Sequence, residues 1–337
     1  MTWRSPASSA GSIFSNRLPS LAPNALTQRL RARRAAGLPI IDLTRSNPTT
    51  CGIFGPEHAE ALQHALAAPG VETYGPNPRG ALEARELIGA RLPRPLPAQQ
   101  VVLTASTSEA YSLLFKLLCD PGDAVLIPQP SYPLFEHLSR LDGVVAEPYA
   151  LDYAGAWQLD LEQLRAVYNR AHGAGCAPRA LLVVNPNNPT GHALDGDELA
   201  ALEAFCAERG MALIGDEVFF AYLPVGTGAP RRYASVSQAT GCLSFCLGGL
   251  SKLGGLPQLK LGWIGCGGPE KLVVAALERL DLIADAYLSV GSPVQLAAEA
   301  LLTLADHRRQ RIAARLARSR VVVDELCAAY PAATPLL

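Results

Sequence analysis

The chain has 337 residues, which at roughly 100–200 residues per domain is enough for about two domains. Hydrophobic residues make up 49% of the chain and charged residues 18%, and 29 Lys and Arg against 30 Asp and Glu leave a formal net charge of −1. A chain so close to neutral gives no electrostatic reason to expect binding to nucleic acid or to an anionic membrane. We therefore expect no partner of either kind.

Eight cysteines are scattered without a CxxC pair, so we expect reduced thiols rather than disulfides or metal ligands. Residues 1–17 lack the apolar core of a signal peptide, and no segment offers the ~18 uninterrupted apolar residues of a membrane span. His58 and His64 have no further ligand in register, and we expect both to be surface residues of a helix. These features predict a soluble cytoplasmic protein without a metal site.

The first predicted element in chain order is a helix over residues 26–37, whose arginines we interpret as a solvent-exposed face. From residue 40 to residue 266, short apolar runs alternate with helical patterns, as in a sheet that is covered by helices on both faces. This pattern predicts a three-layer α/β/α domain with a mostly parallel sheet. The predicted strands are residues 101–104, 124–128, 180–184, 212–215, 244–248 and 262–266.

Two helices carry clear start signals. Ser106 with Glu109 predicts a capping box before an apolar helix, and Asp195 with Glu198 predicts a second one, whose helix ends at Gly210. After Pro269 the pattern is almost wholly helical, with a long charged segment over residues 306–330. We expect a second domain to begin near residues 285–290.

The common catalytic motifs are missing: the sequence has no complete nucleophile elbow, no GxGxxG and no P-loop. Instead, a series of polar segments follows the predicted strands, at the sheet edge where open α/β folds bind ligands. One such segment alone would be a weak signal, but six in order indicate a site. They are residues 74–80, 104–110, 130–133, 185–191, 216–219 and 251–252.

Three of these segments carry a family resemblance: Asn-Pro-Asn-Asn-Pro-Thr-Gly at 185–191, the Asp216-Glu217 pair, and Ser251-Lys252 with Lys260 eight positions on. Over roughly residues 38–320 the chain resembles the class I and II aminotransferases, which are fold-type I enzymes that depend on pyridoxal 5′-phosphate (PLP). The resemblance implies PLP as the cofactor and ping-pong transfer of an amino group between an amino acid and a 2-oxo acid, within amino acid metabolism and biosynthesis. It also implies a PLP-binding large domain over residues 40–287 and a small domain formed by residues 1–39 and 288–337.

The resemblance assigns catalytic roles to two residues. Lys252 matches the lysine that forms a Schiff base with PLP and then moves protons as general base. Asp216 matches the carboxylate that keeps the pyridine nitrogen protonated, so that the ring can accept electrons. Both residues are expected to contact the cofactor.

The remaining assignments concern binding. Tyr132 is expected to stack on the ring and Asn188 to donate to its hydroxyl, while the start of the helix after Ser106 offers donors to the phosphate. Tyr74 matches a tyrosine that reaches the site of the neighbouring subunit, which implies a homodimer. The full cofactor-binding set is Ser106, Thr107, Ser108, Tyr132, Asn188, Asp216, Phe219, Ser251, Lys252, Lys260 and Tyr74, and the substrate-binding set is Ser46, Asn47 and Asn188.

Three positions depart from the commonest family pattern. Phe219 replaces a tyrosine and cannot donate to the ring oxygen, so we expect the Schiff base to keep its proton to higher pH. Gly249 replaces a serine and Lys260 an arginine, so we expect the phosphate to be held less firmly, because lysine offers a point charge rather than a bidentate fork.

The same residues are compatible with two other functional interpretations. A PLP-dependent lyase that breaks a C–S bond would use Lys252 and Asp216 in the same way. The chain ends at Leu337, where the family would continue, so we expect an incomplete small α+β domain. A catalytically impaired remnant of the PLP fold, which lacks the segment that binds the substrate carboxylate, is the third reading.

Overall fold

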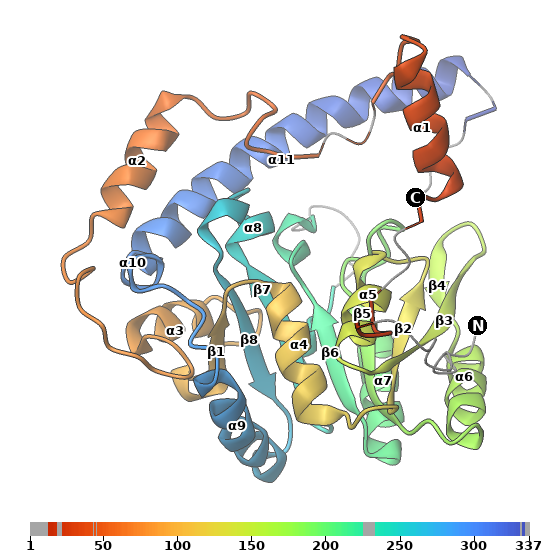
Figure 1. Cartoon of the computed structure of the whole chain (residues 1–337), viewed down its shortest axis with the longest axis vertical. Helices are drawn as coiled ribbons and strands as arrows, with labels where there is room; N and C mark the ends of the chain where they lie inside the picture. Colours follow the sequence, from red (N-terminus) through yellow and green to blue (C-terminus); the bar gives the residue numbers. More distant parts are fainter. Residues whose placement is uncertain are drawn as a thin grey trace.

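The computed structural model describes residues 13–18, 22–42, 44, 46–224, 233–330 and 332–333. Within these ranges one sheet of eight strands crosses the molecule in the order β1-β8-β7-β6-β5-β2-β3-β4 (Figure 1). The strands are β1 (Val101–Thr104), β2 (Ala124–Gln129), β3 (Val145–Tyr153), β4 (Trp157–Leu159), β5 (Pro178–Val184), β6 (Ala212–Asp216), β7 (Ser244–Gly249) and β8 (Gly262–Gly267).

The sheet is mostly parallel, as predicted. Neighbouring strands from β3 through β2, β5 and β6 to β7 run parallel, whereas β8 lies antiparallel between β1 and β7, and β4 is antiparallel to β3. All six predicted strands are present. Strands β3 and β4 were not predicted, because β3 alternates buried and more exposed residues and includes Pro148, unlike the continuous apolar runs of the central strands.

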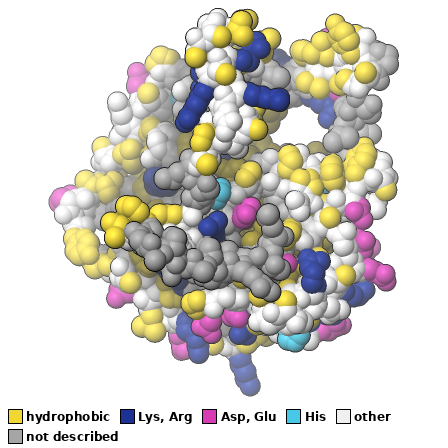
Figure 2. Space-filling view, turned by 45° about the vertical axis from the view of Figure 1, so that its right-hand side comes forward, with side chains coloured by type: hydrophobic (Ala, Val, Ile, Leu, Met, Phe, Trp, Pro, Cys, Tyr) yellow, Lys and Arg dark blue, Asp and Glu magenta, His cyan; other side chains and the backbone are white. Residues whose placement is uncertain are grey.

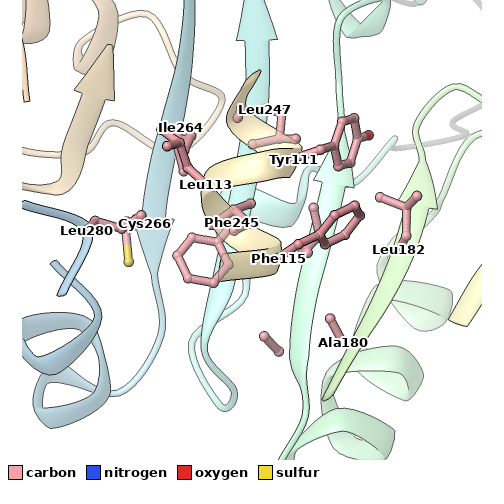
Figure 3. Packing of buried hydrophobic residues seen from close by; sticks show 14 of the residues in the cluster. Tyr111, Leu113, Phe115, Ala180, Leu182, Phe245, Leu247, Ile264, Cys266 and Leu280 are labelled. Carbon is pink, nitrogen blue, oxygen red and sulfur yellow. The ribbon is translucent and has the colours of Figure 1, made fainter. Parts of the chain in front are cut away.

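Helices cover both faces of the sheet. On one face, α4 and α9 pack on strand residues such as Leu182, Phe245 and Ile264, as Figure 3 shows. On the other face, α6 and α7 cover one half of the sheet, and α2, α3, α10 and the start of α11 cover the other. The helices are α1 (Ala25–Ala35), α2 (Pro56–Leu66), α3 (Leu82–Gly89), α4 (Thr107–Leu118), α5 (Leu134–Leu141), α6 (Leu161–Gly173), α7 (Gly196–Arg209), α8 (Leu250–Leu253), α9 (Glu270–Asp285), α10 (Ser292–Leu296) and α11 (Ala298–Ala329).

The helix starts agree largely with the capping signals. The Asp195 and Glu198 side chains form a complete capping box on α7, which ends at Gly210 in the left-handed conformation (φ 65°). At α4 the Ser106 hydroxyl accepts from the Glu109 amide, as expected. The Glu109 carboxylate, however, accepts from the Ala105 amide, one residue before the position that a complete box requires.

The C-terminal helices differ in detail from the prediction. Residues 306–330 do not form a separate element, because α11 is one helix of 32 residues that begins at Ala298. Its first turns bury Leu301, Leu302 and Ala305 against the sheet, whereas most residues after Arg308 are exposed. The proposed domain boundary near residues 287 and 288 stays a prediction.

Two surface predictions have different outcomes. Helix α1 buries none of its residues, so its arginines are solvent-exposed as predicted. The prediction for His58 was wrong: His58 is buried on α2, with its ring edge-on to Phe54 at 5.1 Å. Its Nε2 lies 3.0 Å from Nη1 of Arg311 on α11, a partner about 250 residues away that the sequence spacing alone does not reveal.

Charge and hydropathy agree with the balanced composition. Acidic and basic side chains both occur on the face seen in Figure 2. Within the described part of the chain, no helix combines the length and the apolar character that crossing a membrane requires.

Leu280 and Leu282 on α9 offer a matched test of this architecture. Leu280 is fully buried in the cluster of Figure 3, whereas Leu282 is 77% exposed. We expect Leu280→Ala to lower the free energy of unfolding by about 2–5 kcal/mol, because it leaves a cavity in the core. Leu282→Ala is expected to change it by less than about 0.5 kcal/mol. Urea unfolding checks both, and equal effects would contradict the packing of α9.

Candidate active site

A cavity of about 270 Å³ opens where β5, β6 and β7 end, next to the start of α4. This volume is close to the lower end of the range typical of small-molecule sites. Segments that follow β1, β2, β5, β6 and β7 meet at this point, because parallel strands bring their carboxyl ends to the same edge of a sheet. The cavity is lined by ten of the residues predicted from the sequence: Ser106, Thr107, Ser108, Tyr132, Asn188, Asp216, Phe219, Ser251, Lys252 and Lys260.

Three predicted site residues lie elsewhere. Tyr74 is 78% exposed and borders a different cavity, next to Tyr287. Ser46 and Asn47 are exposed and border a third cavity beside Arg315. A single chain therefore does not bring these residues to the cavity that Lys252 lines.

Asp216 is the last residue of β6 and, among the described residues, one of the few buried carboxylates. Its Oδ2 accepts a hydrogen bond of 2.8 Å from the Tyr111 hydroxyl, and its Oδ1 accepts one of 3.2 Å from the Val218 amide. Burial raises the pKa of Asp216, while these two hydrogen bonds and the positive charge of Lys252 act in the opposite direction. The result is a carboxylate that faces the cavity and gains from a cationic partner.

Tyr111 was not among the predicted site residues. It lies on α4, four residues after Thr107, so both side chains project from the same face of the helix into the cavity. Its ring is 2% exposed and packs edge-on against Phe135 at 5.1 Å. In the sequence it stands within an apolar helical run, and this pattern predicts a tyrosine of the hydrophobic core.

Lys252 lies on α8, a short helix that directly follows β7. Its Nζ is 5.8 Å from the centre of the Phe219 ring. The Tyr222 hydroxyl donates to the carbonyl oxygens of Lys252 and Leu253, at 2.9 and 3.1 Å. Burial raises the pKa of Tyr222 to about 12, so this hydroxyl stays a donor at neutral pH. Tyr222 therefore holds the backbone that carries the lysine.

Arg308 of α11 also fixes the turn that carries Lys252, through the two residues that follow α8. Its guanidinium donates to the carbonyls of Gly254 and Gly255, at 2.7 and 3.1 Å, and lies 3.3 Å from the centre of the Phe54 ring. Burial lowers the pKa of Arg308 to about 10. This arginine is engaged with the backbone, a role that no local sequence pattern indicates because its partners are main-chain carbonyls about 50 residues away.

The Asn-Pro-Asn-Asn-Pro-Thr-Gly segment divides its asparagines between structure and site. Asn185 is buried and donates to the Glu217 carboxylate and to the Ala234 carbonyl. Asn187 donates to the Thr190 hydroxyl and the Pro130 carbonyl. Asn188 lines the cavity and is exposed. Asn185 and Asn187 thus hold the loop in place, which leaves the Asn188 side chain available to contact a ligand in the cavity.

Glu217, the neighbour of Asp216, has a structural role. Its carboxylate accepts from Asn185, from the Val236 amide, from the Ser235 hydroxyl and from the Cys246 thiol. Burial raises its pKa, and these hydrogen bonds offset part of that effect. Glu217 does not line the cavity of Lys252.

One end of the cavity is suited to an anion. The amides of Thr107 and Ser108 belong to the first turn of α4 and have no carbonyl within the helix to donate to. Ser106, Thr107, Ser108 and Ser251 add hydroxyls, and Lys260 adds a positive charge. A Cβ at Gly249 would lie 3.1 Å from the Leu261 oxygen and 3.2 Å from Gly262 Cα, so a side chain fits there only if the neighbours move.

Comparison with known proteins gives a consistent picture. Residues 39–333 match the protein family described as aminotransferase class I and II. An alanine aminotransferase from Mycobacterium tuberculosis is 29% identical over 276 residues, which cover 80% of this chain and 61% of that protein. An S-alkyl-thiohydroximate lyase from Arabidopsis thaliana is 27% identical, over 79% of this chain and 57% of the relative. The chain thus spans about 60% of the length of these curated relatives.

The solved structure of an alanine aminotransferase from Pyrococcus furiosus has the same fold. It superposes with a TM-score of 0.74 and is 28% identical, covering 87% of this chain and 73% of the archaeal one. The order of strands and helices around the cavity is thus that of an established architecture.

Proposed function

The chain belongs to the class I and II aminotransferase family, and from this premise we propose that it is a PLP-dependent aminotransferase acting on an amino acid and a 2-oxo acid. The observation that carries the proposal is the convergence of Lys252, Asp216 and the start of α4 on one cavity. An amine, a buried carboxylate and an anion site are the groups that such a reaction needs.

The donor set of the cavity fits PLP. One end presents hydroxyls, helix amides and Lys260, which suit a phosphate. The Asp216 carboxylate accepts one hydrogen bond on each oxygen and suits a protonated pyridine nitrogen. Asn188, Tyr132 and Phe219 line the walls with an amide and two aromatic rings. When bound, PLP supplies an electron sink that makes a proton on the substrate Cα easier to remove.

Lys252 carries two functions in this proposal. Its Nζ is the amine that binds the cofactor covalently, and once released by the substrate it is the base that takes the proton from the substrate Cα. The hydrogen bonds from Tyr222 and Arg308 to the turn around Lys252 support both functions, because they fix the point from which the side chain swings.

Assembly and location are further parts of the proposal. We propose a homodimer in which Tyr74 contributes to the cofactor site of the other subunit, since its exposed ring lies apart from the cavity of its own chain. We also propose a cytoplasmic location, which rests on the sequence features described above.

Transfer of a labelled amino group tests the function directly. The protein is incubated with PLP, a ¹⁵N-labelled amino acid and an unlabelled 2-oxo acid, and the products are read by mass spectrometry. We expect the label to appear in the amino acid formed from the 2-oxo acid. A protein that binds PLP but transfers no label with any of the common amino acids, using pyruvate, oxaloacetate or 2-oxoglutarate as acceptor, would contradict the proposal.

A lyase acting on a C–S bond is the second candidate, because one relative bears the name of such an enzyme. It would use the same lysine and carboxylate. Release of pyruvate and ammonia from a cysteine conjugate, without any 2-oxo acid present, would favour this reaction over amino-group transfer.

A further inference from the structure

We propose that Tyr111 is a positioning residue for Asp216: its hydroxyl fixes the orientation of the carboxylate and keeps it anionic for a cationic ring nitrogen. This inference rests on the proposed function, because the nitrogen in question belongs to PLP. It goes beyond that function in assigning a role to a residue of α4 that touches the reaction only through Asp216.

The geometry supplies the first argument. The Tyr111 hydroxyl donates to Oδ2 of Asp216 and the Val218 amide donates to Oδ1, so each carboxylate oxygen has one donor. Two donors on different oxygens prevent the carboxylate from rotating. Because both donors are neutral, the negative charge is not cancelled and stays available to a cation in the cavity.

The setting of the Tyr111 ring supplies the second argument. The side chain extends from α4 above the sheet with its hydroxyl at the far end, as Figure 3 shows. Contacts with Phe115 and Phe135 hold the ring, with centroid distances of 6.0 and 5.1 Å. The hydroxyl therefore has a fixed position on the wall of the cavity.

Tyr149 shows what an ordinary buried tyrosine does in this fold. Its ring is equally buried, and its hydroxyl donates to the Leu182 carbonyl at 2.8 Å. Such a bond satisfies the hydroxyl and involves no ionisable group. Tyr111 instead donates to a carboxylate that lines the cavity, and the pair of tyrosines provides a matched control.

The charges around Asp216 determine the direction of the effect. The titratable side chains that interact with it are Tyr111 from α4, Lys252 from α8 and Cys246 from β7. Burial raises the pKa of both Tyr111 and Cys246 well above their usual values, so both stay neutral. Loss of the Tyr111 hydroxyl removes a donor that favours the ionised carboxylate, so Asp216 would take up a proton at higher pH.

Binding of pyridoxine 5′-phosphate tests this inference. The compound has the ring nitrogen and phosphate but no aldehyde, so its binding involves neither a bond to Lys252 nor turnover. Calorimetric titrations from pH 5 to pH 9 compare wild type, Tyr111→Phe and Tyr149→Phe. For Tyr111→Phe we expect the pH below which affinity falls to move up by about one unit, since a hydrogen bond to a charged group is worth roughly tenfold in a proton equilibrium. Tyr149→Phe is expected to follow wild type.

Two further variants test whether the shift comes from the loss of the hydroxyl and whether it acts through Asp216. Tyr111→Leu also removes the hydroxyl and should shift the pH dependence in the same direction. In an Asp216→Asn background no carboxylate is left to titrate, so Tyr111→Phe should cause no shift there. A shift that persisted in that background would show that the hydroxyl acts elsewhere, and would overturn the inference.

The outcomes separate this inference from the proposed function. If wild type binds pyridoxine 5′-phosphate and Tyr111→Phe has the same pH dependence, the role of Tyr111 is wrong while the cofactor assignment stands. If wild type binds the compound at no pH, the cofactor assignment fails, and the role of Tyr111 fails with it.

Discussion

Replacing Lys252 with alanine is expected to lower the rate of amino-group transfer by about 10³-fold or more, because the variant loses both the amine that binds the cofactor and the base that moves the Cα proton. The cavity should otherwise persist, since Tyr222 and Arg308 hold this turn through backbone carbonyls that the substitution keeps. The rate is measured with the labelled amino group, with PLP in excess over the protein.

Two measurements show whether the loss is chemical. Borohydride treatment should fix the cofactor to the peptide that contains Lys252 in wild type and to no peptide in Lys252→Ala. Methylamine should restore part of the rate of Lys252→Ala, because a small amine can take the place of the deleted side chain as base. Lys271→Ala, at an exposed position of α9, is the matched control and should keep full activity. Full activity of Lys252→Ala would remove the basis of the proposed mechanism.

The central strands of the sheet could be predicted because they are short apolar runs that are buried on both faces. The runs at 180–184 and 212–215, for instance, lie within β5 and β6. Strand β3 escaped prediction because it lies toward the edge, with only β4 beyond it, and carries Glu147 and Pro148. Its hydrophobic pattern is too weak to separate it from a loop without knowledge of its neighbours.

Site residues could be predicted where a chemically suitable side chain stands next to a recognisable strand end or helix start. Lys252, Asp216, Asn188 and the start of α4 stand at the ends of predicted strands or at a predicted helix start, and the structure brings them together. Tyr111, Tyr222 and Arg308 could not be found in this way. Each acts through a partner that is distant in the sequence, and each occurs in a segment whose local pattern is that of an ordinary helix or turn.

Replacing Asp216 with asparagine is expected to have opposite effects on activity and on stability. The variant cannot neutralise a protonated ring nitrogen, so the rate of amino-group transfer should fall by about 10²–10³-fold. The protein without cofactor should be more stable than wild type at neutral pH, because the variant no longer buries a carboxylate. The Tyr111 hydroxyl can still donate to the amide oxygen at position 216, so the packing of α4 is retained, while the Val218 amide loses its acceptor and offsets part of the gain.

The pH dependence of this stability gain follows from the raised pKa of Asp216. Below the ordinary aspartate pKa of about 3.9, the side chain is protonated in both the folded and the unfolded protein, and the variant should gain little. As the pH rises from there through the raised pKa, the unfolded chain releases its proton first, so wild type loses stability while the variant does not. The difference in melting temperature should therefore grow with pH and then level off. Asp152→Asn, at an exposed position of β3, should show no such trend, and a constant difference for Asp216→Asn would mean that burial of the Asp216 charge costs the fold nothing.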